Sequence, residues 1–196
     1  MNNLEKICEE IKGCNKCNLC SGRTNAVPGY GHEKARILFI GEGPGKDEDL
    51  QGKPFVGASG KFLTKLIESI GLSREDVFIT NVVKCRPPEN RDPLPDEINA
   101  CWAYLVRQIK EIKPLVIATL GRHSMARFLP DVKISEAHGQ PKIHKGIWCD
   151  EQVYVPLYHP AVALYDPRKR QVLLDDFQVI PKVIKKLTQS KKPNDS

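Results

Sequence analysis

The sequence predicts an α/β fold in which helices cover both faces of a parallel β-sheet. Four short apolar runs rich in β-branched and aromatic residues have the composition of buried strands. They span residues 37–40, 77–83, 115–120 and 153–157. Segments with apolar residues at helical spacing separate these runs, and such alternation is typical of parallel sheets. Chemically unusual residues follow three of the runs, where open α/β sheets bind ligands.

The first predicted strand ends in a glycine-rich loop, Gly-Glu-Gly-Pro-Gly at residues 41–45. Glycine has no Cβ, so a ligand can approach the backbone closely. The loop lacks the Gly-x-Gly-x-x-Gly spacing and the Gly-Lys-Ser/Thr ending of nucleotide-binding loops, which excludes those two kinds of site. An ordinary strand-exit turn is the alternative interpretation.

The predicted helices follow from apolar stripes and from residues that begin or end helices. Ser59 is the expected N-cap of a helix that Gly71 closes, and the segment 96–112 predicts a long amphipathic helix. A short helix is expected through Met125 and Phe128. The remaining expectations are an N-terminal helix at 4–11, an irregular segment at 28–31, a loop or hairpin at 139–146 and one last helix at 172–187.

The bulk composition is that of an ordinary globular protein. The chain has 196 residues, of which 40% are hydrophobic and 28% charged. We expect a single domain over residues 1–190 and a flexible tail at 191–196. The absence of a membrane-length apolar run and of a signal-peptide core predicts a cytoplasmic protein without membrane contact. The net charge of +6 is compatible with a polyanionic partner but is weak evidence alone.

Seven cysteines are many for such a chain, and their odd number argues against a pure disulfide framework. Cys14 and Cys17 have Cys-x-x-Cys spacing, and with Cys85 and Cys101 they predict a four-thiolate site for zinc or an iron–sulfur cluster. Cys101 also falls on a core stripe, so a buried apolar role is its alternative. A Cys14–Cys17 redox pair is disfavoured because the motif precedes every strand. Cys20 is able to replace one ligand, whereas packing roles are expected for Cys8 and Cys149.

Several motifs together resemble the family-four, iron–sulfur uracil-DNA glycosylases. They are Gly-Glu-Gly-Pro-Gly, Gly-Lys-Pro-Phe-Val-Gly, Thr-Asn-Val-Val-Lys-Cys-Arg-Pro-Pro-Glu-Asn-Arg and His-Pro-Ala. Their order and spacing agree from Cys14 to about Leu164. The resemblance implies a three-layer α/β/α sandwich with a central four-stranded parallel sheet. It also implies a [4Fe–4S] cluster held by Cys14, Cys17, Cys85 and Cys101.

Two residues depart from the family pattern. Gly43 stands where the family usually has alanine, which predicts a slightly looser floor of the pocket. Cys20 is an extra thiol close to the cluster loop, so it leaves the ligand set open to exchange.

The resemblance implies that three residues bind uracil. The Asn81 amide offers a donor for O4 and an acceptor for N3–H. Phe55 would stack on the base, and His159 would donate a hydrogen bond to O2 as negative charge develops. Gly41 and Gly43 belong to the same uracil-binding loop. Capping a strand end is the alternative for Asn81, ordinary core packing for Phe55 and a structural role for His159.

The carboxylate that handles water is assigned less directly. In the classical single-domain enzymes a carboxylate occupies the position of Gly43, and the nearest carboxylate here is Glu42. We hypothesise that Glu42 positions water or offsets the cationic sugar; a solvated turn residue is the alternative. Glu48 is expected near uracil C5, where it would exclude thymine's methyl group, with Asp47 or Asp49 as alternatives.

Contacts with DNA are predicted on both sides of the expected pocket. Val162 or Leu164 has the apolar character of a wedge that enters the space vacated by a flipped base. Ser59 and Gly60 are expected to bind a phosphate through backbone amides. Basic side chains are expected to contact the DNA backbone, each with a solvated surface charge as its alternative: Arg86, Arg91, Arg168 and Lys169.

The sequence therefore predicts a monomeric, monofunctional glycosylase that acts on uracil in single- or double-stranded DNA and leaves an abasic site. No lysine is placed as a Schiff-base nucleophile, so no strand cleavage is expected. The alternative is a non-catalytic, cluster- or zinc-bearing nucleic-acid-binding module. An electron carrier is disfavoured because it would not explain Asn81, His159 or the glycine loop.

Overall fold

The protein was analysed as a computed structural model that describes residues 2–189. Its six-stranded sheet has the order β1-β3-β2-β4-β6-β5. The central strands β3, β2, β4 and β6 are parallel, while β1 and β5 pair antiparallel at the two edges. The strands are β1 (Tyr30–Gly31), β2 (Ile37–Gly41), β3 (Phe78–Asn81), β4 (Val116–Leu120), β5 (Lys142–His144) and β6 (Gln152–Leu157).

The four predicted strands are confirmed as the parallel centre of the sheet, but the predicted number of strands is wrong. The segment 28–31, expected to be irregular, contains β1, which pairs Tyr30 with Ile79. Gly31 has a φ of 130°, and a Cβ there would collide with the backbone of Val77, so a glycine is needed at this pairing. At the other edge, the segment 139–146, expected to be a loop or hairpin, contains β5, which pairs antiparallel with β6.

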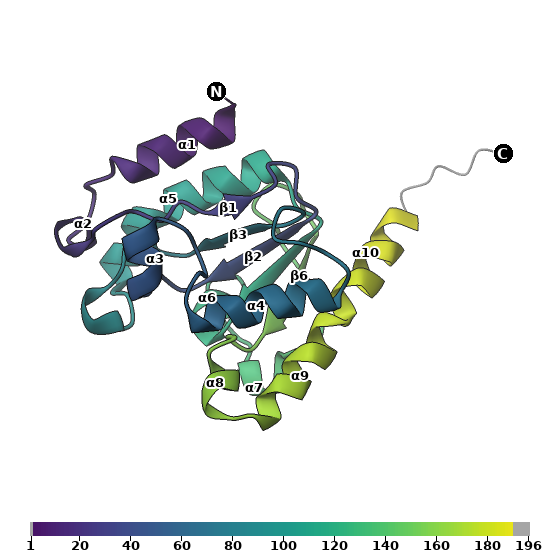
Figure 1. Cartoon of the computed structure of the whole chain (residues 1–196). Helices are drawn as coiled ribbons and strands as arrows, with labels where there is room; N and C mark the ends of the chain where they lie inside the picture. The colour runs from purple at the N-terminus through teal and green to yellow at the C-terminus, as the bar shows by residue number, and fades with distance from the viewer. Residues whose placement is uncertain (1, 190–196) are drawn as a thin grey trace.

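Helices cover the two faces of the sheet with separate cores, as Figure 1 shows. α1 and α5 pack with Leu38 and Ile40 of β2, and α4, α9 and α10 pack with Ile37 and Phe39 of the same strand. This alternation follows from the pleat, which sends successive side chains to opposite faces. The longer helices are α1 (Asn3–Lys12), α4 (Ala58–Ser69), α5 (Pro95–Ile112), α9 (Arg168–Phe177) and α10 (Val179–Gln189). The short ones are α2 (Leu19–Gly22), α3 (Lys46–Gln51), α6 (Arg122–Ala126), α7 (Ile134–Ala137) and α8 (Val162–Tyr165).

Two details of the predicted helices are wrong. The single helix expected at 172–187 is divided into α9 and α10, which meet at Gln178. The N-cap of α4 is Gly57, not Ser59, which lies inside the first turn. The expected flexible tail at 191–196 lies outside the described residues.

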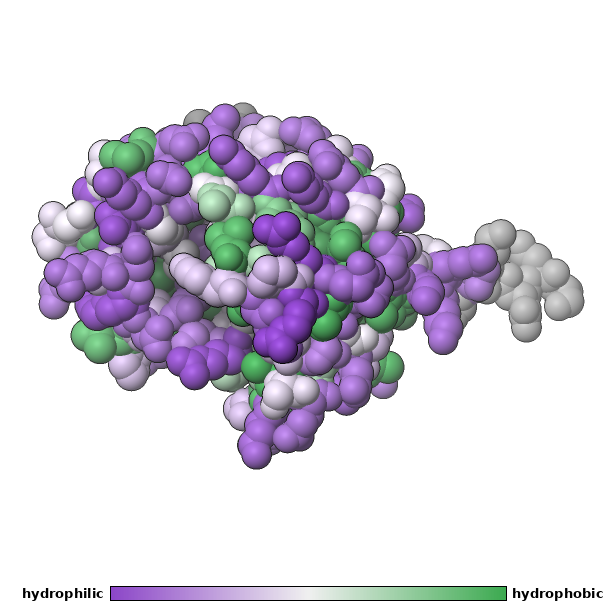
Figure 2. All heavy atoms as spheres, turned by 60° about the horizontal axis from the view of Figure 1, so that its bottom comes forward, coloured by the Kyte–Doolittle hydropathy of each residue, from purple (hydrophilic) through white to green (hydrophobic). Residues whose placement is uncertain are grey.

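The surface offers no broad apolar face in the view of Figure 2, where hydrophilic side chains dominate and apolar ones form small separate patches. Two exposed large apolar side chains are neighbours in α8: Leu164 is 42% exposed and Tyr165 is 87% exposed. Within residues 2–189, no helix combines the length and the apolar composition needed to cross a membrane.

Candidate active site and cysteine pocket

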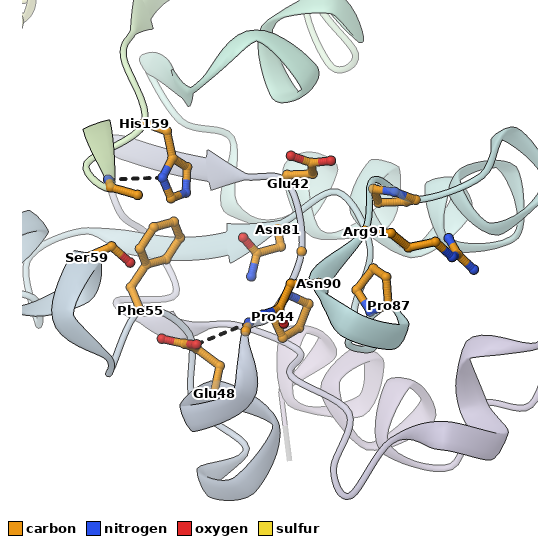
Figure 3. Close-up of a pocket in the computed structure, with 14 residues that line it drawn as sticks. Glu42, Pro44, Glu48, Phe55, Ser59, Asn81, Pro87, Asn90, Arg91 and His159 are labelled. Atoms are coloured by element: carbon orange, nitrogen blue, oxygen red, sulfur yellow. Dashed lines mark hydrogen bonds between the residues drawn. The ribbon is translucent and has the colours of Figure 1, made fainter. Parts of the chain in front are cut away.

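A cavity of about 370 Å³ lies beyond the carboxyl ends of the parallel strands (Figure 3). The ends of β2 and β3 and the segment after β6 meet there, as parallel strands require. Eight of the predicted site residues line it: Glu42, Gly43, Glu48, Phe55, Ser59, Asn81, Arg91 and His159. The other lining residues are Pro44, Gly45, Pro87, Asn90, Pro93 and Ala161.

Asn81 ends β3 and pairs with Gly41 at the end of β2. Its side chain is almost fully buried, yet its Oδ1 atom has no hydrogen-bond partner within the protein. A Cβ on Gly41 would collide with this oxygen and lie 2.6 Å from Phe55 Cζ, so the glycine leaves room for both side chains. A buried amide oxygen without a hydrogen-bond partner lowers the stability of the folded protein. This indicates that a hydrogen-bond donor on a bound ligand completes the site.

Phe55 is held in a strained backbone conformation, with a φ of 52°. Arg74 donates hydrogen bonds to the carbonyl oxygens of Pro54 at 2.6 Å and Phe55 at 3.0 Å. Gly60 packs directly against the Phe55 backbone, where a Cβ would collide. The Phe55 ring lies with its centroid 5.7 Å from that of His159, so the two rings form one wall of the cavity.

His159 is poised as a neutral hydrogen-bond donor. Its Nδ1 atom accepts a hydrogen bond from the Ala161 amide at 3.2 Å, which assigns the single proton of the neutral ring to Nε2. Burial lowers the pKa of His159 from 6.5 to about 4, because the charged ring would lose its hydration. The imidazole is therefore uncharged at neutral pH.

Glu48 lines the cavity and fastens two loops together. Its Oε2 atom accepts from the Gly45 amide at 3.1 Å, and its Oε1 accepts from the Val56 and Gly57 amides at 2.8 and 2.9 Å. These bonds join the glycine loop to the segment that carries Phe55. A contact with uracil C5 stays a prediction, and the hydrogen bonds add a structural role for the same carboxylate.

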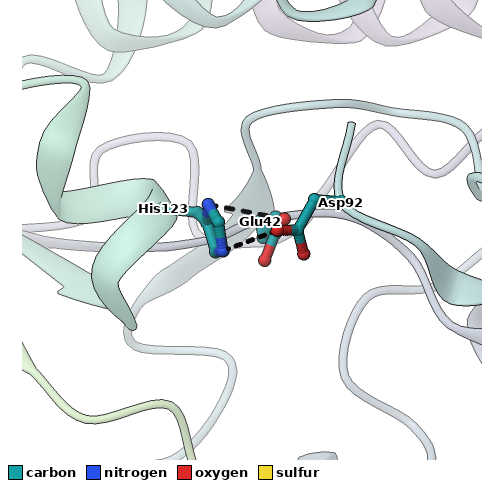
Figure 4. A group of neighbouring side chains, drawn as sticks. All are labelled: Glu42, Asp92 and His123. Atoms are coloured by element: carbon teal, nitrogen blue, oxygen red, sulfur yellow. Dashed lines mark ion pairs between the residues drawn. The ribbon is translucent and has the colours of Figure 1, made fainter. Parts of the chain in front are cut away.

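Glu42 faces His123 and Asp92, two residues that the sequence analysis did not single out (Figure 4). Its Oε1 atom is buried without a hydrogen-bond partner and lies 4.0 Å from His123 Nδ1, while His123 Nε2 is 3.2 Å from Asp92. Burial raises the pKa of Glu42 above its ordinary value, and His123 opposes this rise. The three ligand atoms lie within 4.8 Å of one another, but Asp92 is exposed and the group carries no metal assignment.

The predicted DNA contacts are not all at the cavity. Ser59 lines it, whereas Gly60 is buried behind Phe55. Arg86 lies outside it and donates to Asn90 Oδ1 at 2.8 Å. Val162 packs against the core under α9, whereas Leu164 is exposed, so of the two wedge candidates only Leu164 projects from the surface.

The four predicted ligand cysteines do come together. Cys14, Cys17, Cys85 and Cys101 line one pocket, and Cys20 lies there as a fifth thiol. Burial raises the pKa of Cys85 to about 11, and the thiols of Cys17 and Cys101 also have a pKa raised by burial.

Cations surround this pocket. Arg23 donates a hydrogen bond to Cys85 Sγ at 3.0 Å, and Lys16 and Lys84 also line the pocket. Lys84 is buried in full, and burial lowers the pKa of its ammonium to about 7. The buried thiols of Cys85 and Cys101 thus lie beside a buried ammonium and a half-buried guanidinium, surroundings that favour an anionic thiolate centre.

The sequence analysis missed the residues that act through others. His123 lies far in sequence from Glu42, and Lys84 reaches Gln108, 24 positions away, besides its near neighbours Thr80 and Asn81. Arg23 and Cys85 are 62 positions apart, so only the folded chain brings them together. Pro87 and Pro93 lay within a proline-rich loop whose path was not predicted, yet both line the cavity.

Comparison with known proteins agrees with this geometry. A family model described as the uracil DNA glycosylase superfamily matches residues 28–187. A type-4 uracil-DNA glycosylase of Saccharolobus solfataricus is 51% identical over 94% of this chain and 88% of its own length. Those of Sulfurisphaera tokodaii and Archaeoglobus fulgidus are 52% and 49% identical, each over 92% of this chain, and they are covered over 84% and 92% of their lengths. The chain therefore belongs to the uracil DNA glycosylase superfamily and, within it, to the type-4 uracil-DNA glycosylases.

Proposed function

We infer that the protein is a DNA repair enzyme that removes uracil from DNA by hydrolysing its N-glycosidic bond. It is a monofunctional glycosylase and leaves an abasic site. The observation that carries the inference is the buried Asn81 amide, whose unpaired Oδ1 lies in the same cavity as Phe55 and His159. Membership of the type-4 family gives the substrate class.

Uracil recognition is assigned to the end of β3. The Asn81 Oδ1 atom accepts from uracil N3–H and its amide group donates to O4, which gives the buried oxygen its missing partner. Phe55 stacks on the flipped base. Gly41 admits both side chains, and Gly43 forms the neighbouring part of the loop. Glu48 holds the loops around the base and lies on the side assigned to uracil C5.

Bond cleavage requires stabilisation of the uracil anion. Neutral His159 donates its Nε2 proton in a hydrogen bond to uracil O2, where negative charge develops. A neutral donor avoids the desolvation of a charged ring before substrate binds. One such donor in a dry site typically supplies about 2.7–4 kcal/mol of transition-state stabilisation.

Water activation is assigned to Glu42. Its buried, unpaired Oε1 is an acceptor for the proton of an attacking water or a negative charge beside the cationic sugar. His123 lies on the far side of this carboxylate and opposes its protonation. The reaction at C1′ therefore has a half-buried carboxylate with an imidazole beside it.

DNA binding is assigned to the rim of the cavity. Leu164 fills the gap left by the flipped base, with Val162 supporting the turn beneath it. The amides of Ser59 and Gly60 in the first turn of α4 receive a phosphate, and Arg86 contacts the backbone. The protein acts as a monomer on single- or double-stranded DNA.

We propose that the cysteine pocket holds a [4Fe–4S] cluster rather than zinc. Four cysteines from distant segments line one pocket together with Arg23 and Lys84, and the resemblance to the iron–sulfur uracil-DNA glycosylases favours a cluster at these thiols. Cys14, Cys17, Cys85 and Cys101 would hold it, and Arg23 would offset its charge. When bound, the cluster supplies a rigid cross-link between segments far apart in the chain.

The test is an excision assay on matched oligonucleotides that carry one uracil or one thymine. The protein is expected to produce alkali-labile sites at uracil in single-stranded DNA and opposite guanine, and none at thymine. Strand scission without alkali would contradict a monofunctional enzyme. Binding of uracil-containing DNA without any alkali-labile site would contradict the inferred activity itself.

A further inference from the structure

Lys84 is a buried lysine that the catalytic assignments do not use. Only 1% of it is exposed, and each of its three ammonium protons has an acceptor. The Nζ atom donates to Thr80 Oγ1 at 2.6 Å, to the Asn81 carbonyl oxygen at 2.8 Å and to Gln108 Oε1 at 2.7 Å. One ammonium group therefore fastens the last two residues of β3 to α5.

These acceptors are themselves fixed. The Thr80 hydroxyl donates to the carbonyl oxygen of Pro28 at 2.7 Å, and the Gln108 amide donates to the same oxygen at 2.9 Å. The Lys84 carbonyl oxygen accepts from the Val27 amide at 2.7 Å. The network is closed and buried, so Nζ holds the Asn81 backbone in addition to the pairing of Asn81 with Gly41 in the sheet.

No carboxylate neutralises this ammonium group. Within residues 2–189, none of the ion pairs with Asp or Glu includes Lys84. The thiols of Cys101 and Cys8 favour its charged form when they are ionised, and Lys84 lines the cysteine pocket. A buried cation is unfavourable without an anion, so an anionic centre in this pocket would balance the charge of Lys84.

We propose that Lys84 is a positioning residue that couples the cysteine-held cluster to uracil recognition. It is the buried counter-ion of the thiolate centre, and through its bond to the Asn81 carbonyl it fixes the amide that binds uracil. The proposal rests on the proposed function. It explains why one short segment, residues 81–85, carries an active-site amide, a buried ammonium and a ligand cysteine.

The coupling is tested with Lys84→Met in the full chain, compared with wild type and with Lys110→Met, which removes an exposed charge from α5. Losing a cation beside an anionic cluster disfavours added negative charge, so the cluster's reduction potential is expected to fall. Single-turnover uracil excision is expected to fall on the order of 10–100-fold, because a small displacement of a positioned group is costly to the rate. Lys110→Met should match wild type in both measurements.

A change in only one of the two measurements, or in neither, overturns the coupling. Circular dichroism shows whether Lys84→Met folds. If it does not fold, the proposal is tested with Gln108→Leu instead. That variant keeps the ammonium charge but removes one of its anchors, so excision should fall about tenfold or more with an unchanged potential. A wild-type rate in Gln108→Leu would then overturn the proposal.

Two further outcomes separate this inference from the proposed function. A wild-type protein that excises no uracil refutes the proposed function and the coupling with it. A wild type that excises uracil, while Lys84→Met behaves like Lys110→Met, refutes the coupling alone. A wild type purified with zinc and without iron also overturns the coupling.

Discussion

The uracil cavity and the cysteine pocket share one segment of chain but are built in opposite ways. Asn81 and Pro87 line the cavity, while Lys84 and Cys85, which lie between them in sequence, line the cysteine pocket. The cavity is shaped by hydrogen bonds within the protein and leaves neutral or anionic acceptors unpaired. The cysteine pocket gathers thiols and cations. The first is preorganised for a neutral base, and the second suits the anionic cluster that we propose for it.

Removing a ligand from the cysteine pocket is expected to have the largest effect, because metal binding contributes directly to folding. Cys101→Ala should lose iron and the visible absorption of the cluster, and destabilise the protein by several kcal/mol or more. Cys8→Ala is the matched control on the neighbouring helix and should keep its iron. Full iron content in Cys101→Ala would contradict the ligand set, and iron loss in Cys20→Ala would place Cys20 among the ligands.

Removing the donor from the cavity is expected to affect rate without affecting the cluster. His159→Ala should lower single-turnover excision about 100- to 1000-fold, the usual effect of deleting one such donor. His144→Ala, in the exposed edge strand β5, should leave the rate unchanged. Loss of iron in His159→Ala would show that the two sites are not separable in the way described. A rate within a few-fold of wild type would contradict the role of His159.

A smaller effect is expected at Glu42, and it should depend on pH. Because burial raises the pKa of Glu42, excision should decline with falling pH before an ordinary glutamate would protonate. The carboxylate is the active form, so activity is present above the folded-state pKa and is lost as pH falls through it. Glu42→Gln should be at least about tenfold slower and should lack this acidic limb. An unchanged rate and pH profile would exclude Glu42 from the water step.

The smallest effect is expected at the rim, where DNA rather than the base is contacted. Leu164→Ala should slow excision from double-stranded DNA several-fold and leave single-stranded DNA nearly unaffected, because only a duplex has a stack to fill. Val162→Ala is the matched comparison beneath the turn. Equal effects of Leu164→Ala on both substrates would contradict the wedge.

The same contrast explains what the sequence was able to predict. The cavity follows from strand logic: Gly41, Asn81 and His159 each follow a buried apolar run, and parallel strands bring their carboxyl ends together. The edge strand β1 was not predicted, because a strand of two residues, one of them a glycine, is too short to show the alternation of apolar and polar side chains that marks a strand. The division of the last helix at Gln178 is marked in sequence only by Pro181, which lies in the first turn of α10, where its missing N–H costs no intrahelical hydrogen bond.

The cysteine pocket was less predictable. Spacing left zinc and an iron–sulfur cluster open, and the ligand set came from resemblance to a family. The roles of its cations were not predicted, because Arg23 contacts Cys85 from 62 positions away and Lys84 is fixed partly by Gln108 of α5, 24 positions away. Glu48 was assigned to base selection from its place near the glycine loop. Its three hydrogen bonds to backbone amides depend on loops that the sequence did not place.

The central claim is that one buried amide recognises uracil. The direct measurement is single-turnover release of free uracil from the same oligonucleotide by wild type and by Asn81→Leu, at matched iron content. The account predicts release by wild type and a loss of at least about 100-fold in Asn81→Leu, because the base would lose its hydrogen bonds in a site built to supply them. Equal release by the two proteins would contradict it.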